Sequence, residues 1–225
     1  MADPPPTPAP PTPAPPTPAS LTPAPPLVLA SGSPRRAELL ARLGVTLDVR
    51  PSDVDETPHA GEPPAELVRR LAALKAMAAR AGDDEVVVAA DTEVVLDDQV
   101  LGKPVDRAAA AAMLRRLSGR PHEVLTGVAV RRGPLVHVEV VRTTVVFRPL
   151  TDAEVAWYLD TGEPFDKAGG YGLQGAAAAL VARIEGSDTN VIGLPLAETV
   201  ALLREVGLDL LAPPATATAD GQVRR

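Results

Sequence analysis

Four polar segments interrupt the apolar pattern of this sequence, and the first of them could bind an anion. Residues 31–36 read Ser-Gly-Ser-Pro-Arg-Arg and follow a short apolar run. A Gly/Ser turn that leads from a strand into a helix directs backbone N–H groups outward, which favours a negatively charged ligand. The adjacent Arg35 and Arg36 add planar donors that suit phosphate. Many helices begin with Ser-Pro, but positive charge at a helix start opposes the helix dipole, so the arginines favour a functional role.

The second segment places an acid directly after the most apolar stretch of the chain. Asp91 follows residues 85–90, a run of β-branched and small side chains, and we expect it to end a central strand. Active groups gather at strand ends in α/β sheets, where a carboxylate could hold Mg²⁺ or orient a water molecule for attack. A turn-forming aspartate is an equally good interpretation of Asp91 alone.

The third and fourth segments are rich in glycine. In residues 101–104 a glycine allows close backbone approach and Lys103 supplies a compact charge for phosphate, although a lysine in a surface turn is ordinary. Residues 162–175 combine five glycines with acidic, basic and amide side chains. Such crowding indicates turns with positive φ or close contact with a ligand.

The sequence lacks the motifs of several common nucleotide, hydrolase and metal sites. Gly170, Gly172 and Gly175 match G-x-G-x-x-G, but no apolar strand leads into the match and no clear helix follows, so we reject a dinucleotide site. The sequence has neither a P-loop nor a G-x-S-x-G motif. The three histidines lack metal-site spacing, and surface or strand positions are the better interpretation of His59, His122 and His137.

The elements that must position these segments alternate between strand and helix. Strands are predicted at residues 27–30, 45–50, 85–90, 122–130, 135–147 and 177–184, with a hairpin of 93–96 and 99–101 around Asp97 and Asp98. Helices are predicted from Pro34, capped by Ser33, to Gly44, and at 64–80, 106–119, 151–161 and 196–206. The helix at 64–80 should bury one face formed by Leu67, Leu71, Leu74 and Met77. This alternation predicts an α/β fold with a mixed, partly antiparallel twisted sheet flanked by helices.

Length and composition limit the remaining choices. The 225 residues suit one domain or two small lobes, and we expect residues 27–211 to fold. The Pro-rich residues 1–26 and the polar residues 212–225 are expected to be disordered tails, although the first could also bind an aromatic groove of a partner. A net charge of −7 argues against a nucleic-acid surface, and the sequence has no cysteine. No apolar run approaches the ~20 residues of a membrane span, and no secretory signal is recognisable, so we expect a cytoplasmic protein with no membrane partner.

Taken together and in this order, the polar segments resemble the Maf family of nucleoside triphosphate pyrophosphatases. The resemblance covers residues 27–206 and neither tail. It is carried by the motifs LASGSPRR at 29–36, ADT at 90–92, LGKP at 101–104, DKAGGYGLQG at 166–175 and EGSDTNVIGLPL at 185–196. It implies a Maf- and ITPase-like fold with a cleft between two lobes.

The resemblance also implies a role for individual residues. Asp91 corresponds to the general base, and Arg35, Thr92 and Gln174 to positions that select the base of the nucleotide. Further pocket residues around the phosphates and the metal correspond to Ser33, Arg36, Glu56, Lys75 and Lys103. Without the resemblance, Lys75 would be taken as a solvated helix lysine and Glu56 as a surface acid. The metal would be Mg²⁺ or Mn²⁺, with Glu56 and Asp91 as its nearest ligands.

The implied reaction converts a nucleoside triphosphate to the monophosphate and pyrophosphate. The motif at 166–175 is similar to the branch that acts on dTTP and UTP, although Gly170 stands where a somewhat larger small residue is frequent. The resemblance also suggests a homodimer. Two alternatives stay open: a nucleotide-binding regulator of cell division or septum formation with little turnover, and a phosphatase or kinase that uses the same anion site.

Overall fold

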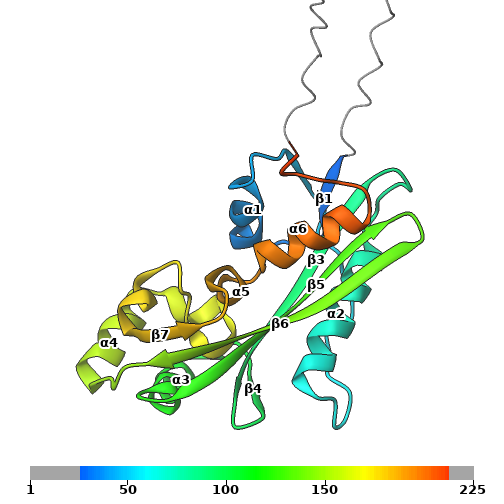
Figure 1. The fold of residues 1–225 in the computed structure, drawn as a ribbon. Helices are drawn as coiled ribbons and strands as arrows, with labels where there is room; N and C mark the ends of the chain where they lie inside the picture. Colours follow the sequence, from blue (N-terminus) through cyan, green and yellow to red (C-terminus); the bar gives the residue numbers. More distant parts are fainter. Residues whose placement is uncertain (1–25, 213–225) are drawn as a thin grey trace, which may run out of the picture.

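Three parallel strands form one end of the sheet in the computed structural model, which describes residues 26–212 (Figure 1). The strand β1 (Leu27–Leu29) lies between β2 (Leu47–Val49) and β3 (Val86–Leu96) and pairs with both in parallel. The connections contain the helices α1 (Pro34–Ala41) and α2 (Pro64–Ala78). Parallel neighbours require such crossover connections, because a tight turn can join only antiparallel strands.

Antiparallel strands complete the sheet. The strand β3 forms a hairpin with β4 (Gln99–Leu101), and its other edge pairs with β5 (Pro121–Arg132). Beyond β5 follow β6 (Leu135–Phe147) and β7 (Val181–Glu185), so the order is β2-β1-β3-β5-β6-β7, with β4 beside β3. This arrangement confirms the predicted α/β class and its mixed sheet.

Two hydrophobic cores lie at opposite ends of the long strands and define two lobes. In the first lobe, α1 and α6 (Leu196–Glu205) pack against residues such as Val88 and Val130. In the second, α3 (Arg107–Leu117) and α4 (Asp152–Asp160) pack against residues such as Val94 and Val145. The helix α2 covers the opposite face of the sheet, and β3, β5 and β6 run through both lobes (Figure 1).

The buried face of α2 differs from the predicted one. Leu67 and Leu71 are buried as expected, but Leu74 and Met77 are 41% and 60% exposed. The buried face instead combines Leu67 and Leu71 with Val68, Ala72, Lys75 and Ala76. Small side chains on this face let the helix lie close to the sheet, and the larger Leu74 and Met77 point away from it.

A glycine in β5 sets how closely α2 approaches the sheet. Gly127 lies directly opposite Asp91 in the neighbouring strand. A Cβ atom at Gly127 would lie 2.2 Å from the carbonyl oxygen of Val68, which is far inside van der Waals contact. The missing side chain therefore allows the backbone of α2 to rest on β5, next to the strand that carries Asp91.

Three further predictions need correction. Asp91 does not end a strand, because β3 continues to Leu96 with an unbroken ladder to β5. Ser33 occupies the N-cap position but makes no capping hydrogen bond, and its own N–H instead bonds Ser31 Oγ at 3.2 Å. Residues 176–180 form a 3₁₀ helix before β7 rather than a strand, since Glu163 accepts hydrogen bonds from Ala176 N at the start of this alanine-rich run.

Other predictions of local structure are confirmed. Asp106 caps α3 through Ala109 N, and Thr151 and Glu154 form the predicted capping box of α4. The hairpin turn at Asp97 and Asp98 has positive φ at both residues. The short helix α5 (Asp188–Ile192) was not predicted. The predicted tails lie, apart from their innermost residues, outside the described range.

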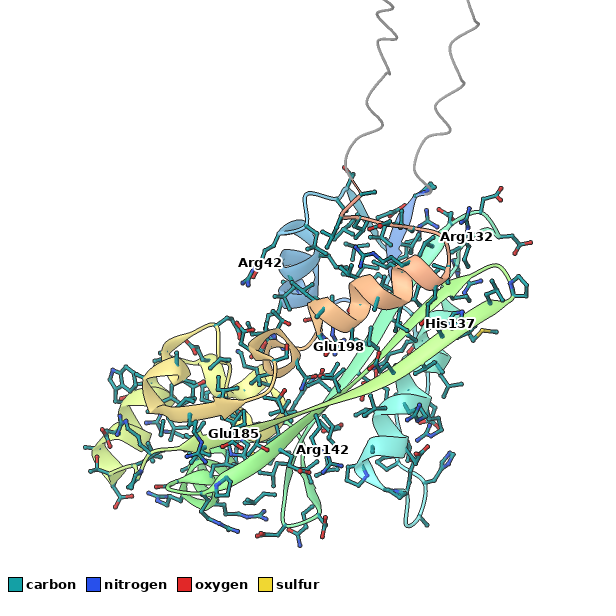
Figure 2. The ribbon with its side chains drawn as sticks, in the orientation of Figure 1. Arg42, Arg132, His137, Arg142, Glu185 and Glu198 are labelled. Atoms are coloured by element: carbon teal, nitrogen blue, oxygen red, sulfur yellow. The ribbon has the colours of Figure 1, made fainter. Side chains whose placement is uncertain are left out.

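Charged side chains occupy the outer surface of the sheet and its helices (Figure 2). His137 Nδ1 in β6 lies 2.9 Å from Glu205 Oε2 of α6, and Arg142 of β6 forms an ion pair with Glu123 of β5. His137 therefore has the surface strand position that its sequence context favoured. Within residues 26–212, no helix has both the length and the apolar character needed to cross a membrane.

The close contact between α2 and β5 makes Gly127 a strict requirement of the fold. Replacing Gly127 with alanine should lower the free energy of unfolding by about 2 kcal/mol, because the methyl group forces the helix away from the sheet. Urea denaturation measures the effect. Gly82→Ala is the control, since Gly82 is exposed and its Cβ would meet only the flexible end of Glu85 at 3.8 Å. Equal stability of the two variants would contradict the packing argument.

Candidate active site

An interruption along one edge of β3 leaves space for a cavity. On this edge, residues 86–88 pair with β1 and residues 94–96 pair with β4. Between them, Asp91, Thr92 and Glu93 pair only with β5 on the other edge. The space left beside these three residues is a cavity of about 460 Å³ between the two lobes. The cleft implied by the resemblance is therefore present.

The structure brings all nine predicted site residues to this cavity. They come from the start of α1, the loop after β2, α2, β3, the loop after β4 and the glycine-rich segment: Ser33, Arg35, Arg36, Glu56, Lys75, Asp91, Thr92, Lys103 and Gln174. Residues that are more than a hundred positions apart in sequence thus share one cavity. The structure shows that the nine residues lie around one cavity. The role of each residue in binding or catalysis stays a prediction.

Lys75 joins two of the carboxylates. Its ammonium nitrogen lies 2.6 Å from Asp91 Oδ1 and 2.8 Å from Glu56 Oε1. Lys75 and Asp91 are 8% and 6% exposed, whereas the Glu56 side chain is 59% exposed. A solvated lysine, which the sequence alone would favour, is therefore excluded: Lys75 points from the buried face of α2 toward β3.

Glu93 adds a third carboxylate to which the sequence analysis gave no role. Successive side chains alternate between the faces of a strand, so Asp91 and Glu93 share the α2 face of β3. Burial, together with the nearby charge of Asp91, raises the pKa of Glu93 to about 7. Asp91 Oδ2 and Glu93 Oε2 are both buried without a hydrogen-bond partner in the described chain.

On the other face of β3, Arg36 is held by hydrogen bonds to uncharged groups. Its guanidinium donates to Gly193 O at 2.8 Å, Ser31 Oγ at 3.0 Å and Thr92 Oγ1 at 3.2 Å. Burial lowers the pKa of Arg36. Within residues 26–212 no carboxylate lies within ion-pair distance of Arg36, so its fixed positive charge is available to an anion in the cavity.

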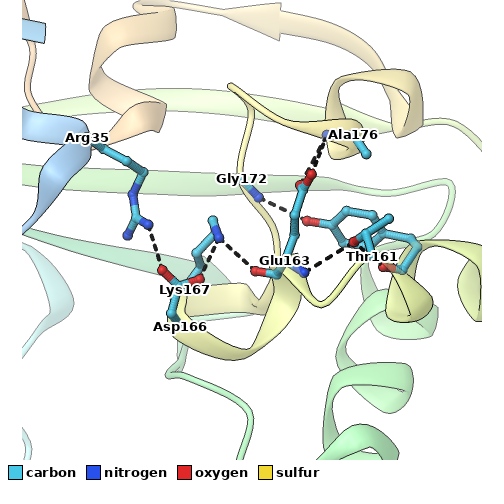
Figure 3. A network of polar contacts seen from close by, with 8 residues as sticks. Arg35, Thr161, Glu163, Asp166, Lys167, Gly172 and Ala176 are labelled. Atoms are coloured by element: carbon cyan, nitrogen blue, oxygen red, sulfur yellow. Dashed lines mark hydrogen bonds and ion pairs between the residues drawn. The ribbon is translucent and has the colours of Figure 1, made fainter. Parts of the chain in front are cut away.

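A polar network closes the cavity from the side of the second lobe (Figure 3). Asp166 Oδ2 accepts a hydrogen bond from Arg35 Nη1 at 2.9 Å, which links the glycine-rich segment to α1. Lys167 Nζ bonds Asp166 and the carbonyl oxygen of Glu163. The Glu163 carboxylate in turn accepts from Ala176 N. Asp166 and Lys167 line the cavity, and only their place in the glycine-rich segment signalled them.

The glycines of this segment are needed for contacts within the chain itself. A Cβ atom at Gly172 would lie 2.6 Å from Lys167 Cε, and one at Gly175 would lie 2.3 Å from Glu163 Oε2. The close approach expected from the glycine content is thus found, and its partners are Lys167 and Glu163. The exposed Gln174 lies between these two glycines and lines the cavity.

Among the described residues, no group of three or more His, Cys, Asp or Glu side chains could by itself hold a metal ion. The histidines do not line the cavity. His122 is buried and its Nε2 lies 2.8 Å from the hydroxyl of Tyr171, whose ring forms part of the cavity wall.

These features define an α/β protein whose interlobe cleft combines buried carboxylates with fixed cations, as the handling of a phosphorylated ligand requires. The profile of the family described as Maf-like protein matches residues 26–206. The chain therefore belongs to the Maf family, as the sequence motifs suggested.

Proteins of known name support this assignment. The chain is 58% identical over 191 residues to a dTTP/UTP pyrophosphatase of Anaeromyxobacter dehalogenans, covering 83% of this chain and 97% of the relative. It is 55% identical over 185 residues to a dTTP/UTP pyrophosphatase of Myxococcus xanthus, covering 82% and 94%. A solved nucleoside-triphosphatase, or dITP/XTP pyrophosphatase, of Mycobacterium abscessus matches with 17% identity and a TM-score of 0.39 over 83% of this chain and 97% of its own, a likeness too weak to define the fold.

The burial of His122 behind the cavity should make stability depend on pH. His122 is 3% exposed, and burial lowers its pKa from 6.5 to about 4. Because the folded-state pKa lies below the unfolded value, the stabilisation is complete above pH 6.5 and is lost as the pH falls toward 4. We expect the His122-dependent loss to be on the order of 2 kcal/mol between pH 7 and pH 5.

Urea denaturation at pH 7 and pH 5 tests this expectation. His122→Gln should lack this part of the pH dependence, whereas His59→Gln, which changes an exposed loop residue, should behave like the wild type. Identical pH dependence in the wild type and His122→Gln would refute the argument.

Proposed function

We propose that this chain hydrolyses nucleoside triphosphates, with dTTP and UTP as preferred substrates, to the monophosphate and pyrophosphate. The observation that carries the proposal is the buried Asp91, which lies in one cavity with Arg35, Arg36, Lys103 and Lys167. The names of the relatives at 55% and 58% identity agree with this activity. A cytoplasmic location and a homodimer stay predictions.

The basic side chains would bind the triphosphate. A triphosphate carries about four negative charges, so several cations must converge on it. Arg36 is held at three points and needs little reorganisation to meet a phosphate oxygen. Lys103 is exposed at the cavity and forms no ion pair within residues 26–212, so its charge is also available.

Asp91 would serve as the general base. Lys75 occupies Oδ1, which fixes the carboxylate and leaves the buried Oδ2 to receive a proton. A water held by Oδ2 would attack the α-phosphorus while its proton passes to Asp91. The bond from the α-phosphorus to the bridging oxygen breaks, and pyrophosphate leaves with the bonding electrons. The basic side chains stabilise the negative charge on the departing pyrophosphate.

The carboxylate side of the cavity also fits a divalent cation. Mg²⁺ and Mn²⁺ take oxygen ligands, and they often use one or two carboxylates together with substrate phosphates. Asp91 and Glu56 would hold the ion, and the unpartnered Asp91 Oδ2 is an oxygen without a protein donor. When bound, the ion would supply positive charge to the phosphate oxygens.

Selection of the base would involve Gln174 and Arg35. The Gln174 amide is exposed at the cavity and could pair with both a donor and an acceptor on a base edge. Thr92 was predicted to read the base as well. Its hydroxyl is already bonded to Arg36 and lies 3.0 Å from Thr126 Oγ1, so Thr92 would act by fixing the arginine.

A substrate panel tests the proposed function. With Mg²⁺ or Mn²⁺, we expect faster release of pyrophosphate from dTTP and UTP than from dATP, dGTP and dCTP, with the monophosphate as the other product. Formation of diphosphate and phosphate would instead indicate a phosphatase. Tight binding of dTTP without turnover would favour the nucleotide-binding regulator.

The role of Asp91 can be tested by one conservative substitution. Asp91→Asn should lower kcat by about 10²–10⁴-fold, because the amide cannot accept the proton of the attacking water. Binding of a non-hydrolysable nucleotide, measured by calorimetry, should persist. The control is Asp98→Asn, at an exposed turn position with positive φ that asparagine tolerates. Pyrophosphate release by Asp91→Asn at a near-normal rate would refute the assignment.

A further inference from the structure

The carboxylate side of the cavity carries more negative charge than the protein compensates. Glu56, Asp91 and Glu93 line this side, and Lys75 is the cation that pairs with the first two. Glu93 forms no ion pair within residues 26–212. A site for a polyanionic nucleotide would not gather three acids next to the substrate unless a cation accompanied it.

The positions of the free oxygens indicate where that cation lies. Asp91 and Glu93 are two residues apart on the same face of β3, about 7 Å along the strand. Each has one buried oxygen without a partner, and Asp91 is more than nine-tenths buried. Leaving such oxygens unpartnered is costly, so a ligand is expected to satisfy them.

Glu56 is less suited than Glu93 to bind the cation. Its side chain is 59% exposed, and its Oε1 is bound to Lys75. Glu93 has a free oxygen on the face of β3 that also carries the free oxygen of Asp91. Two carboxylates on one rigid strand are also better positioned than one on a strand and one in a loop.

We propose that Glu93 is a protein ligand of the divalent cation, beside Asp91. The inference rests on the proposed function, since the substrate phosphates would complete the coordination. It assigns Glu93 a role that neither the motifs nor its sequence position revealed.

The test measures cation binding without catalysis. The full chain is saturated with dUTP in which a methylene group replaces the oxygen between the α- and β-phosphorus atoms, and Mn²⁺ is titrated while free Mn²⁺ is followed by electron paramagnetic resonance. Glu93→Gln should weaken Mn²⁺ binding at least tenfold, because an amide is a poorer ligand for a hard cation. Affinity for the analogue in EDTA should not decrease, since the substitution removes a negative charge beside the phosphates.

Two variants make the result specific. Glu139→Gln removes an exposed glutamate from β6, which β5 separates from β3, and should leave Mn²⁺ affinity unchanged. Glu56→Gln should have a smaller effect than Glu93→Gln. Circular dichroism verifies that each variant is folded, and Glu93→Gln should fold readily because it removes an unpaired charge.

The inference is overturned if Glu93→Gln weakens Mn²⁺ binding less than tenfold, or if Glu56→Gln has the larger effect. Its failure can be distinguished from failure of the proposed function. An active enzyme whose Glu93→Gln variant keeps its Mn²⁺ affinity would refute only the role of Glu93. A chain that binds Mn²⁺ through Glu93 but releases no pyrophosphate would refute only the proposed reaction.

Discussion

The ammonium group of Lys75 is the charge on which the geometry of the cavity depends. It lies between Asp91 of β3 and Glu56 of the loop after β2, and so ties a helix, a strand and a loop together. A buried ammonium and a buried carboxylate each cost several kcal/mol unless they satisfy one another. The packing of α2 on Gly127 keeps them within hydrogen-bond distance. Stability and chemistry are therefore coupled, because the contact that seats the helix also orients the carboxylate.

The cavity lies where the pairing along one edge of β3 changes from parallel to antiparallel. Parallel pairing ends with β1 and antiparallel pairing begins with β4, and β3 passes the gap between them with one edge free. Its side chains reach the cavity from both faces: Asp91 and Glu93 from the α2 face, and Thr92 from the α1 face. One short stretch of strand thus offers acids on one side and, through Thr92, a fixed arginine on the other.

Much of this arrangement could be predicted from sequence, and the failures have physical reasons. Strands with continuous β-branched runs and helices with side-chain caps, such as α3 and α4, were placed well because their signals are local. The interior position of Asp91 was missed because only pairing with β5 and β4 shows that an acid at this point continues the strand. The place of Lys75 in the pocket was implied by the family resemblance and by nothing in the helical pattern. Glu93 was overlooked because its unpartnered oxygen becomes visible only once the neighbouring strands are in place.

The three long strands also determine how the protein can move. Because β3, β5 and β6 run unbroken from one lobe into the other, the two lobes share a hydrogen-bonded spine and cannot swing apart like hinged domains. Entry of a ligand must instead depend on movement of segments that pack on the sheet without being part of it. The main such segment is residues 162–175, which contact α1 through Asp166 and Arg35. That contact is exposed enough to be screened by salt, so the mobility of the entrance should follow ionic strength while the carboxylate wall stays rigid.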